Sequence, residues 1–212
     1  FFYYQGAEEV QRYADYSDMM QMLVKQWRMD WNDWNLPFLF VQLPMYLADG
    51  EKDDSYWALQ REQQYIASMM IQNAGMISLA DCGEYDNIHP LDKKTPGERL
   101  FQLAKNLVYD KQGTITATAA QLFSDNGKLY VTFDHLHEKL VMQTANGCPF
   151  EISGEDNLFY PAKADVIHGN MLCISNPAVK FPSAVKYAWY NFGEAALFTE
   201  SGNPVSPFFK CV

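Results

Sequence analysis

The sequence predicts an α/β protein in which a parallel sheet flanked by helices is followed by a mostly antiparallel, sandwich-like β region. Up to residue 112, apolar runs of strand length alternate with long amphipathic segments. From residue 113 onward the pattern changes to short alternating stretches separated by turn residues. The chain has 212 residues and is 48% hydrophobic, so it can bury a substantial core. We therefore expect two domains, over 1–112 and 113–212, of which the second is all-β.

In the first half, each apolar run is followed by a helical pattern. Residues 8–31 carry apolar side chains at spacings near three and four, as in a helix that packs on a sheet. Gly75 is placed to end the second helix, and Thr95 is placed to cap the third, with Pro96 and Glu98 in its first turn. The expected elements are strands over 1–4, 36–43 and 76–80 and helices over 8–31, 55–73 and 95–109.

In the second half, turn pairs separate the apolar stretches. Asn126-Gly127 precedes KLYVTF, and Asn146-Gly147 follows KLVMQT. Such pairs are typical of turns between antiparallel strands. Three further alternating stretches follow: ADVIHG, MLCISN and AVKYAWYN.

The strand–helix alternation places a candidate site at one edge of the parallel sheet. Right-handed crossovers give parallel strands, and such sheets bind ligands outside the carboxyl ends of their strands. Three loops lie there: Gln5 to Glu9, Gln42 to Tyr46, and Asp81 to Pro90. The sequence therefore predicts that these loops together form the active crevice.

The third of these loops contains a pair of residues typical of hydrolases. Asp86 precedes His89 by three residues, so their side chains can hydrogen-bond directly. The carboxylate would then fix the tautomer of the imidazole and stabilise its cation, which favours esterase chemistry. A plain loop-stabilising hydrogen bond is the alternative. No serine of the chain lies in a G-x-S-x-G or G-[DQ]-S setting, so the nucleophile is not evident.

The amino-acid composition limits the classes of molecule that the chain is expected to bind. The formal net charge is −10 with no run of Lys or Arg, which argues against nucleic acid and anionic membranes. No apolar run is long enough to span a bilayer, and FFYYQG is unlike a signal peptide. Because the first residue is Phe1 rather than Met, an origin within a longer protein stays open. A small neutral or polar substrate is expected.

The four cysteines form no C-x-x-C pair, so a zinc site is unsupported. No other metal and no cofactor is predicted. Buried free thiols, or at most one disulfide, are the expected state. Cys82 lies in the loop with His89, and a Cys–His nucleophile pair is a second, less favoured hypothesis.

A family resemblance extends from about Tyr3 to Phe208. It rests on five segments in a fixed order: YYQGAEEV, LPFLFVQLPMY, DNIHPLDKKTPGERL, FPSAVKYAWYNF and GNPVSPFF. These segments resemble the sialate O-acetylesterases, which are carbohydrate acetylesterases of the SGNH hydrolase superfamily. The resemblance implies a serine esterase that removes O-acetyl groups from sialic acid or a related acetylated sugar. It also implies a secreted, periplasmic or lysosomal location.

The resemblance assigns roles to particular residues. Its D-x-x-H-P block implies that Asp86 and His89 are the triad acid and base. Its Trp-Tyr-Gln-Gly-Glu block maps onto Tyr3 to Gly6, which implies that Gln5 and Gly6 line the site and help to hold the oxyanion. Gln42, which begins the second loop, is a further candidate for substrate binding.

Two departures from the family pattern matter. The G-Q-S-N type block that carries the nucleophile precedes the first matching segment, so it is absent from this chain. We expect an N-terminal segment or a separate subunit to supply the serine, and this chain alone to be inactive. Ala7 stands where the family has Glu, and Glu8 is a candidate substitute in a shifted register. The alternatives are a non-catalytic carbohydrate-binding or structural fragment and an acetylxylan or other polysaccharide acetylesterase.

Overall fold

The computed structural model describes all residues from 1 to 212 and divides into two compact units. The first comprises Phe1–Ile115 and Tyr190–Phe192, and the second comprises Thr116–Trp189 and Gly193–Val212. Tyr190–Phe192 therefore belongs to the first unit, although it follows most of the second unit in the sequence. A single division at residue 112 does not describe this return of the chain.

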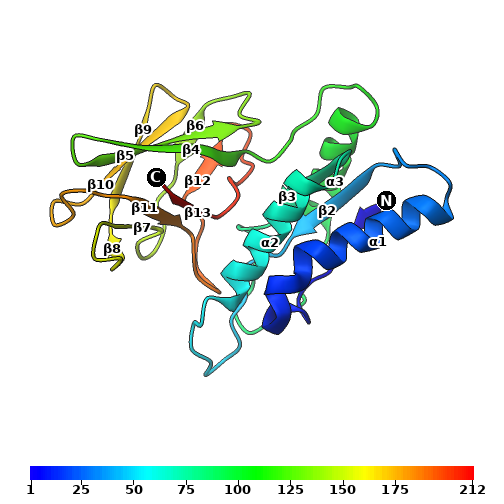
Figure 1. The fold of residues 1–212 in the computed structure, drawn as a ribbon, viewed down its shortest axis with the longest axis horizontal. Helices are drawn as coiled ribbons and strands as arrows, with labels where there is room; N and C mark the ends of the chain where they lie inside the picture. Colours follow the sequence, from blue (N-terminus) through cyan, green and yellow to red (C-terminus); the bar gives the residue numbers. More distant parts are fainter. The chain divides into compact units, whose positions relative to one another are not determined.

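The first unit is built on a three-stranded parallel sheet in the order β1-β2-β3 (Figure 1). A 3-10 helix, η1, precedes α1, where the sequence predicted one continuous helix. The elements are β1 (Phe2–Tyr3), η1 (Val10–Asp15), α1 (Tyr16–Asp30), β2 (Phe38–Gln42), α2 (Tyr56–Met70), β3 (Ala74–Ser78) and α3 (Lys94–Leu107). The predicted parallel sheet with flanking helices is confirmed.

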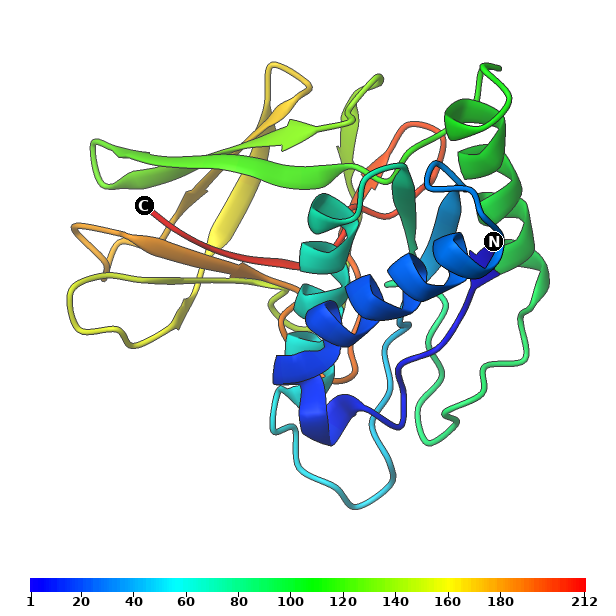
Figure 2. The ribbon, with the colours of Figure 1, turned by 45° about the vertical axis from the view of Figure 1, so that its right-hand side comes forward.

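Helices cover both faces of this sheet, as Figures 1 and 2 show. Phe38 and Phe40 of β2 point to one face, where they pack with apolar residues of α1 and α2. Leu39 and Val41 point to the other face, where Leu103 of α3 lies. Because successive strand residues alternate between the faces, the apolar residues from Phe38 to Val41 can be buried on both. This explains why β2 appears in the sequence as a continuous apolar run.

Two predicted helix ends differ from the structure. Helix α2 ends at Met70, and Gly75 lies within β3, so Gly75 does not end the helix. Asn73 adopts the positive φ (53°) that the chain needs before the strand. Thr95 lies inside the first turn of α3, and the capping side chain is Asp92. Its carboxylate accepts from the backbone N–H groups of Lys94 and Thr95, both at 3.0 Å.

The second unit is antiparallel, as predicted. Asn126 and Gly127 both have positive φ and join β4 to β5 in a tight hairpin. Asn146-Gly147 does not join a hairpin, because β6 pairs with β12 and β7 pairs with β11. One sheet contains β4 (Thr118–Asp125), β5 (Lys128–Asp134), β10 (Met171–Ser175) and β9 (Lys163–Ile167); a second contains β13 (Phe208–Cys211), β11 (Ala184–Tyr187), β7 (Phe150–Ser153) and β8 (Tyr160–Pro161); a third contains β12 (Leu197–Thr199) and β6 (Leu140–Met142).

Apolar side chains join the two larger sheets of the second unit. Phe133 of β5 contacts Phe208 of β13 edge-to-face, and Phe208 in turn packs on the ring of Tyr187. The Tyr187 hydroxyl accepts from the backbone N–H groups of Ala196 and Leu197, which ties the segment before β12 to this core. None of the helices of the chain has the length and apolar character needed to cross a bilayer. All four cysteines are free thiols.

Candidate active site at the carboxyl ends of the strands

The loops that follow β1, β2 and β3 surround one cavity of about 290 Å³ in the first unit. Parallel strands end at the same edge of their sheet, so the loops after them converge. The first loop contributes Gln5 to Glu8, the second contributes Leu43 and Pro44, and the third contributes Ile88, His89 and Lys93. Tyr4 and Trp57 complete the lining. The predicted crevice therefore exists, and His89 lies on its wall.

Gly6 has a backbone conformation and a setting that suit glycine. Its φ is +134°, a value that L side chains rarely adopt, and the residue is buried. An added Cβ would lie 3.0 Å from the Gln60 and Gln64 side-chain nitrogens and 3.2 Å from the Tyr16 hydroxyl. No acceptor within the chain takes the Gly6 backbone N–H. Gly6 itself lines the cavity, which makes this N–H a candidate donor to a bound group.

Two buried side chains hold the Gln5–Gly6 segment in place. The Tyr16 hydroxyl donates to the Gln5 carbonyl at 3.0 Å, and the Gln64 amide donates to the same oxygen at 3.2 Å. The Gln64 side-chain oxygen also accepts from the Leu43 N–H at 2.8 Å. One buried amide thus fixes the loop after β1 against the loop after β2. Burial is also the main cause that raises the pKa of Tyr16 above its ordinary value, so its hydroxyl stays a donor.

The Gln5 side chain is engaged within its own loop. Its amide nitrogen donates to the Glu9 carboxylate, and its amide oxygen accepts from the Tyr3 hydroxyl at 3.2 Å. Glu9, four residues after Gln5, is therefore the carboxylate that Gln5 contacts. Glu8 is exposed and lines the cavity. Of the two candidate oxyanion donors in this segment, the Gly6 N–H is the one without a partner.

The predicted direct hydrogen bond between Asp86 and His89 is not formed in this structure. The Asp86 carboxylate accepts from the backbone N–H of Asp49 at 2.9 Å. Asp86 also has a positive φ of 56°. This conformation joins the Asp86 side chain to the segment after β2 rather than to His89. The spacing in the sequence allowed the contact, but the backbone of the loop determines where the carboxylate lies.

Glu84 organises the loop that carries His89. Its carboxylate accepts from the Asn87 side chain and from the Leu91 backbone N–H, both at 2.6 Å. The Asn87 side-chain oxygen accepts from the His89 backbone N–H at 3.1 Å. His89 thus lies between two positions that are tied to one carboxylate.

Gln42 does not line the cavity. Its side chain is fully buried, and its amide donates to the backbone carbonyl of Arg61 at 3.1 Å. A buried polar group that joins β2 to α2 in this way satisfies its own hydrogen bonds within the core. Gln42 is therefore engaged within the core in this structure, and its part in substrate binding stays a prediction.

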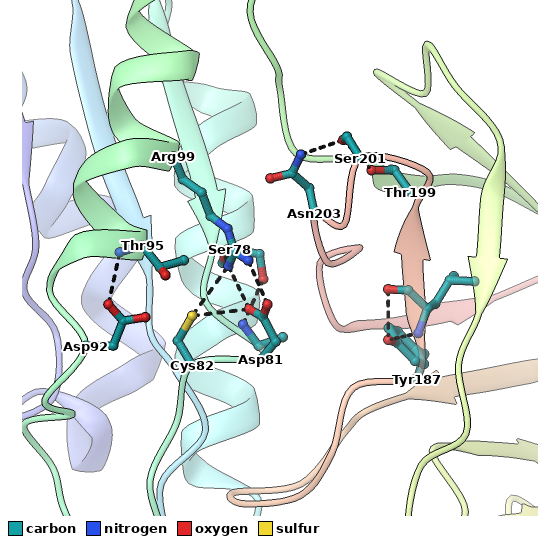
Figure 3. Close-up of polar contacts among 12 residues, drawn as sticks. Ser78, Asp81, Cys82, Asp92, Thr95, Arg99, Tyr187, Thr199, Ser201 and Asn203 are labelled. Atoms are coloured by element: carbon teal, nitrogen blue, oxygen red, sulfur yellow. Dashed lines mark hydrogen bonds and ion pairs between the residues drawn. The ribbon is translucent and has the colours of Figure 1, made fainter.

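The start of the third loop is joined to α3 by a partly buried ion pair, shown in Figure 3. The Arg99 guanidinium donates to both carboxylate oxygens of Asp81 at 2.6 Å and to the Ser78 carbonyl at 3.0 Å. Cys82 lies beside this pair and donates to Asp81 at 3.4 Å. Burial first, and then the Asp81 charge, raise the pKa of Cys82 to about 12. A thiol with that pKa is a poor nucleophile at neutral pH, and Cys82 does not line the cavity.

Gly83 brings the third loop close to the second. A Cβ at this position would lie 2.1 Å from the Met45 carbonyl oxygen, so only glycine allows the approach. Ile88 packs near Leu43 and Trp57 on the same side of the sheet. These contacts bring the His89 loop against the residues after β2, which places the imidazole next to the first loop.

Sequence reasoning missed Lys93, Glu84, Tyr16 and Gln64. Lys93 lies four residues after His89, and its ammonium group lies 5.7 Å from the centre of the Tyr4 ring. It has no carboxylate partner within ion-pair distance. Glu84 could have been suspected from its place in the loop, but its partners are backbone and amide groups that spacing does not reveal. Tyr16 and Gln64 lie on α1 and α2, outside the three loops, so the loop sequences do not identify them.

Comparison with known proteins finds carbohydrate esterases. Residues 1–107 match the family described as carbohydrate esterase, sialic acid-specific acetylesterase. Among solved structures, the chain is similar to XAC1771, a carbohydrate acetylesterase from Xanthomonas citri, with 30% sequence identity and a TM-score of 0.88. The similarity covers 99% of this chain and 49% of that one, so the chain spans about half the length of XAC1771. No curated protein sequence matches this chain.

Proposed function

The chain belongs to the sialic acid-specific acetylesterase family of carbohydrate esterases, and we propose that it carries the general base of an enzyme that removes O-acetyl groups from sialic acid or a related acetylated sugar. One observation carries this proposal. His89 lines the same cavity as the Gly6 backbone N–H, which has no partner in the chain. A base and an oxyanion donor on opposite loops of one cavity are what acyl transfer requires.

The proposed mechanism is nucleophilic acyl transfer. A serine hydroxyl gives its proton to His89 while its oxygen attacks the acetyl carbonyl, and the Gly6 N–H receives the developing oxyanion. The sugar hydroxyl then leaves with the proton from His89. Water repeats the sequence on the acetyl-enzyme, which releases acetate and restores the serine. Because no Ser, Thr or Cys lines the cavity, the serine comes from a segment or subunit outside these 212 residues.

Asp86 remains our candidate for the carboxylate that orients His89. In this conformation its carboxylate accepts a hydrogen bond from the Asp49 backbone N–H, and this hydrogen bond is exposed to solvent. To act in catalysis it must exchange that N–H for the imidazole when the site is assembled. Both residues lie in one irregular loop, where exchange of an exposed hydrogen bond costs little.

Lys93 supports an anionic sugar as the substrate. It is the single Lys or Arg side chain that lines the cavity. Sialic acid carries a carboxylate, whereas acetylated xylan does not, so an ammonium group here favours the former. Glu8 lines the same cavity and opposes an anion, so the two charges must lie toward different parts of the substrate.

The substitution Lys93→Gln is expected to raise KM for an O-acetylated sialoside about fivefold, the value of a partly exposed charge pair. We expect kcat to change little, because the charge lies outside the reacting atoms. Acetate release by the full-length protein is the measurement, with acetylated xylooligosaccharide as the neutral substrate. Lys94→Gln is the matched control, because Lys94 faces Glu98 on the surface of α3.

An equal effect of Lys93→Gln on both substrates would show that Lys93 does not recognise a carboxylate. It would favour the polysaccharide acetylesterase as the function. If the full-length protein binds acetylated sugars but releases no acetate from any of them, the chain is part of a non-catalytic carbohydrate-binding protein.

A further inference from the structure

We propose that Glu84 is a positioning residue for His89, because its carboxylate closes the loop from Glu84 to Leu91 and so fixes the place of the imidazole in the cavity. The proposal rests on the proposed function of His89. It assigns a role to a side chain that sequence reasoning missed.

The contacts of Glu84 enclose His89 on both sides. One carboxylate oxygen accepts from Leu91, two residues after His89, and the other accepts from Asn87, two residues before it. Asn87 then accepts the backbone N–H of His89. The backbones of Glu84 and Asn87 also form an isolated antiparallel bridge. The hydrogen bonds of one carboxylate therefore hold the backbone of this loop in place, as backbone hydrogen bonds do in a β-sheet.

The neighbours of His89 are anchored, while His89 itself is exposed. Pro90 is buried, and Ile88 packs beside Leu43 and Trp57. These apolar contacts hold the loop against the unit but do not determine the direction of the imidazole. The hydrogen bonds of Glu84 and Asn87 set the backbone on either side of His89, and with it the position from which its side chain extends. Asp86 does not contribute here, since its carboxylate points to Asp49.

The electrostatics agree with this geometry. The hydrogen bond from the Leu91 backbone, then that from Asn87, hold the pKa of Glu84 below its ordinary value, and the nearby Lys93 charge acts in the same direction. A lowered pKa in the folded state means that ionised Glu84 supports the loop above the ordinary carboxyl pKa. That support is lost as the pH falls through the lowered value. At neutral pH the carboxylate is charged and can accept both hydrogen bonds.

Glu84→Ala in the full-length protein tests the proposal. We expect kcat for acetate release from an acetylated sugar to fall about tenfold or more, with KM within about twofold of wild type, because only the alignment of the base changes. The kcat of Glu84→Gln should lie between those of wild type and Glu84→Ala, because the amide oxygen of the glutamine can still accept from the Leu91 backbone N–H. Glu98→Gln is the control, because Glu98 makes only an exposed pair with Lys94 and should leave kcat unchanged.

Amide hydrogen exchange separates positioning from loss of fold. In Glu84→Ala, exchange at Leu91 and His89 should accelerate, while exchange in β2 and α3 stays as in wild type. A kcat within about twofold of wild type in Glu84→Ala would overturn the proposal. So would unchanged exchange at Leu91. If wild type releases no acetate, the proposed function fails instead, and exchange at Leu91 and His89 alone then decides whether Glu84 fixes this loop.

Discussion

His89→Ala is expected to lower kcat for acetate release by about a thousandfold in the full-length protein, the usual value of a general base. The expected loss is this large because His89 is the only imidazole that lines the cavity. Binding of the sugar does not need the base, so KM should stay near that of wild type. Steady-state assays that follow released acetate measure both constants.

His137→Ala is the matched control for this substitution. His137 is exposed and belongs to the second unit, outside the cavity. The His137→Ala variant should retain the kcat of wild type. Comparable rates for His89→Ala and wild type would remove His89 as the base and, with it, the proposed mechanism.

Gly6→Ala is expected to have the second large effect, on both stability and catalysis. Alanine at a φ of +134° is strained by about 1–3 kcal/mol, and its methyl group would press on the buried Gln60 and Gln64 amides. Relief of that strain would displace the Gly6 N–H. If this N–H is an oxyanion donor, kcat falls about a hundredfold or more.

Gly97→Ala is the control for this glycine substitution. Gly97 lies in α3, its φ is not positive, and a Cβ there would meet nothing within 4 Å. Alanine in a helix is favoured over glycine by about 1 kcal/mol, so this variant should be at least as stable as wild type. Urea unfolding curves for both variants give the two free energies. A Gly6→Ala variant with unchanged stability and unchanged kcat would contradict the role given to Gly6.

The architecture of the first unit could be predicted because it follows from local sequence patterns. The apolar run of β2 and the helical spacing before and after it leave few alternatives to a parallel sheet with crossover helices. The details that failed depend on competition between neighbours. Asn73 rather than Gly75 adopts the positive φ, and Asp92 rather than Thr95 caps α3, because several nearby residues could serve and packing selects one.

The return of Tyr190–Phe192 to the first unit could not be predicted. It depends on Asn191, whose side chain accepts the Trp57 N–H at 3.0 Å and donates to Asp54 at 2.9 Å. The partners of Asn191 are more than 130 residues away in the sequence. No local pattern marks such a contact.

The candidate site was predicted in part. The convergence of three loops follows from parallel topology, and it places His89 and Gly6 around one cavity. Residue spacing could not give the hydrogen-bond partners. Asp86 lies at the right spacing for His89, yet it bonds to Asp49, because φ angles within the loop direct its side chain elsewhere. Gln42 lies at a strand end, but its side chain points into the core rather than into the cavity.

The proposed function requires that His89 act as the general base for a serine that lies outside these 212 residues. The most direct test is a crystal structure of the full-length protein after reaction with a serine-directed phosphonate. We predict a phosphonylated serine whose oxygen lies about 3 Å from the His89 imidazole, with the phosphonyl oxygen at the Gly6 N–H. An adduct on a serine remote from this cavity, or a His89 ring with no hydroxyl-bearing residue beside it, would contradict the claim.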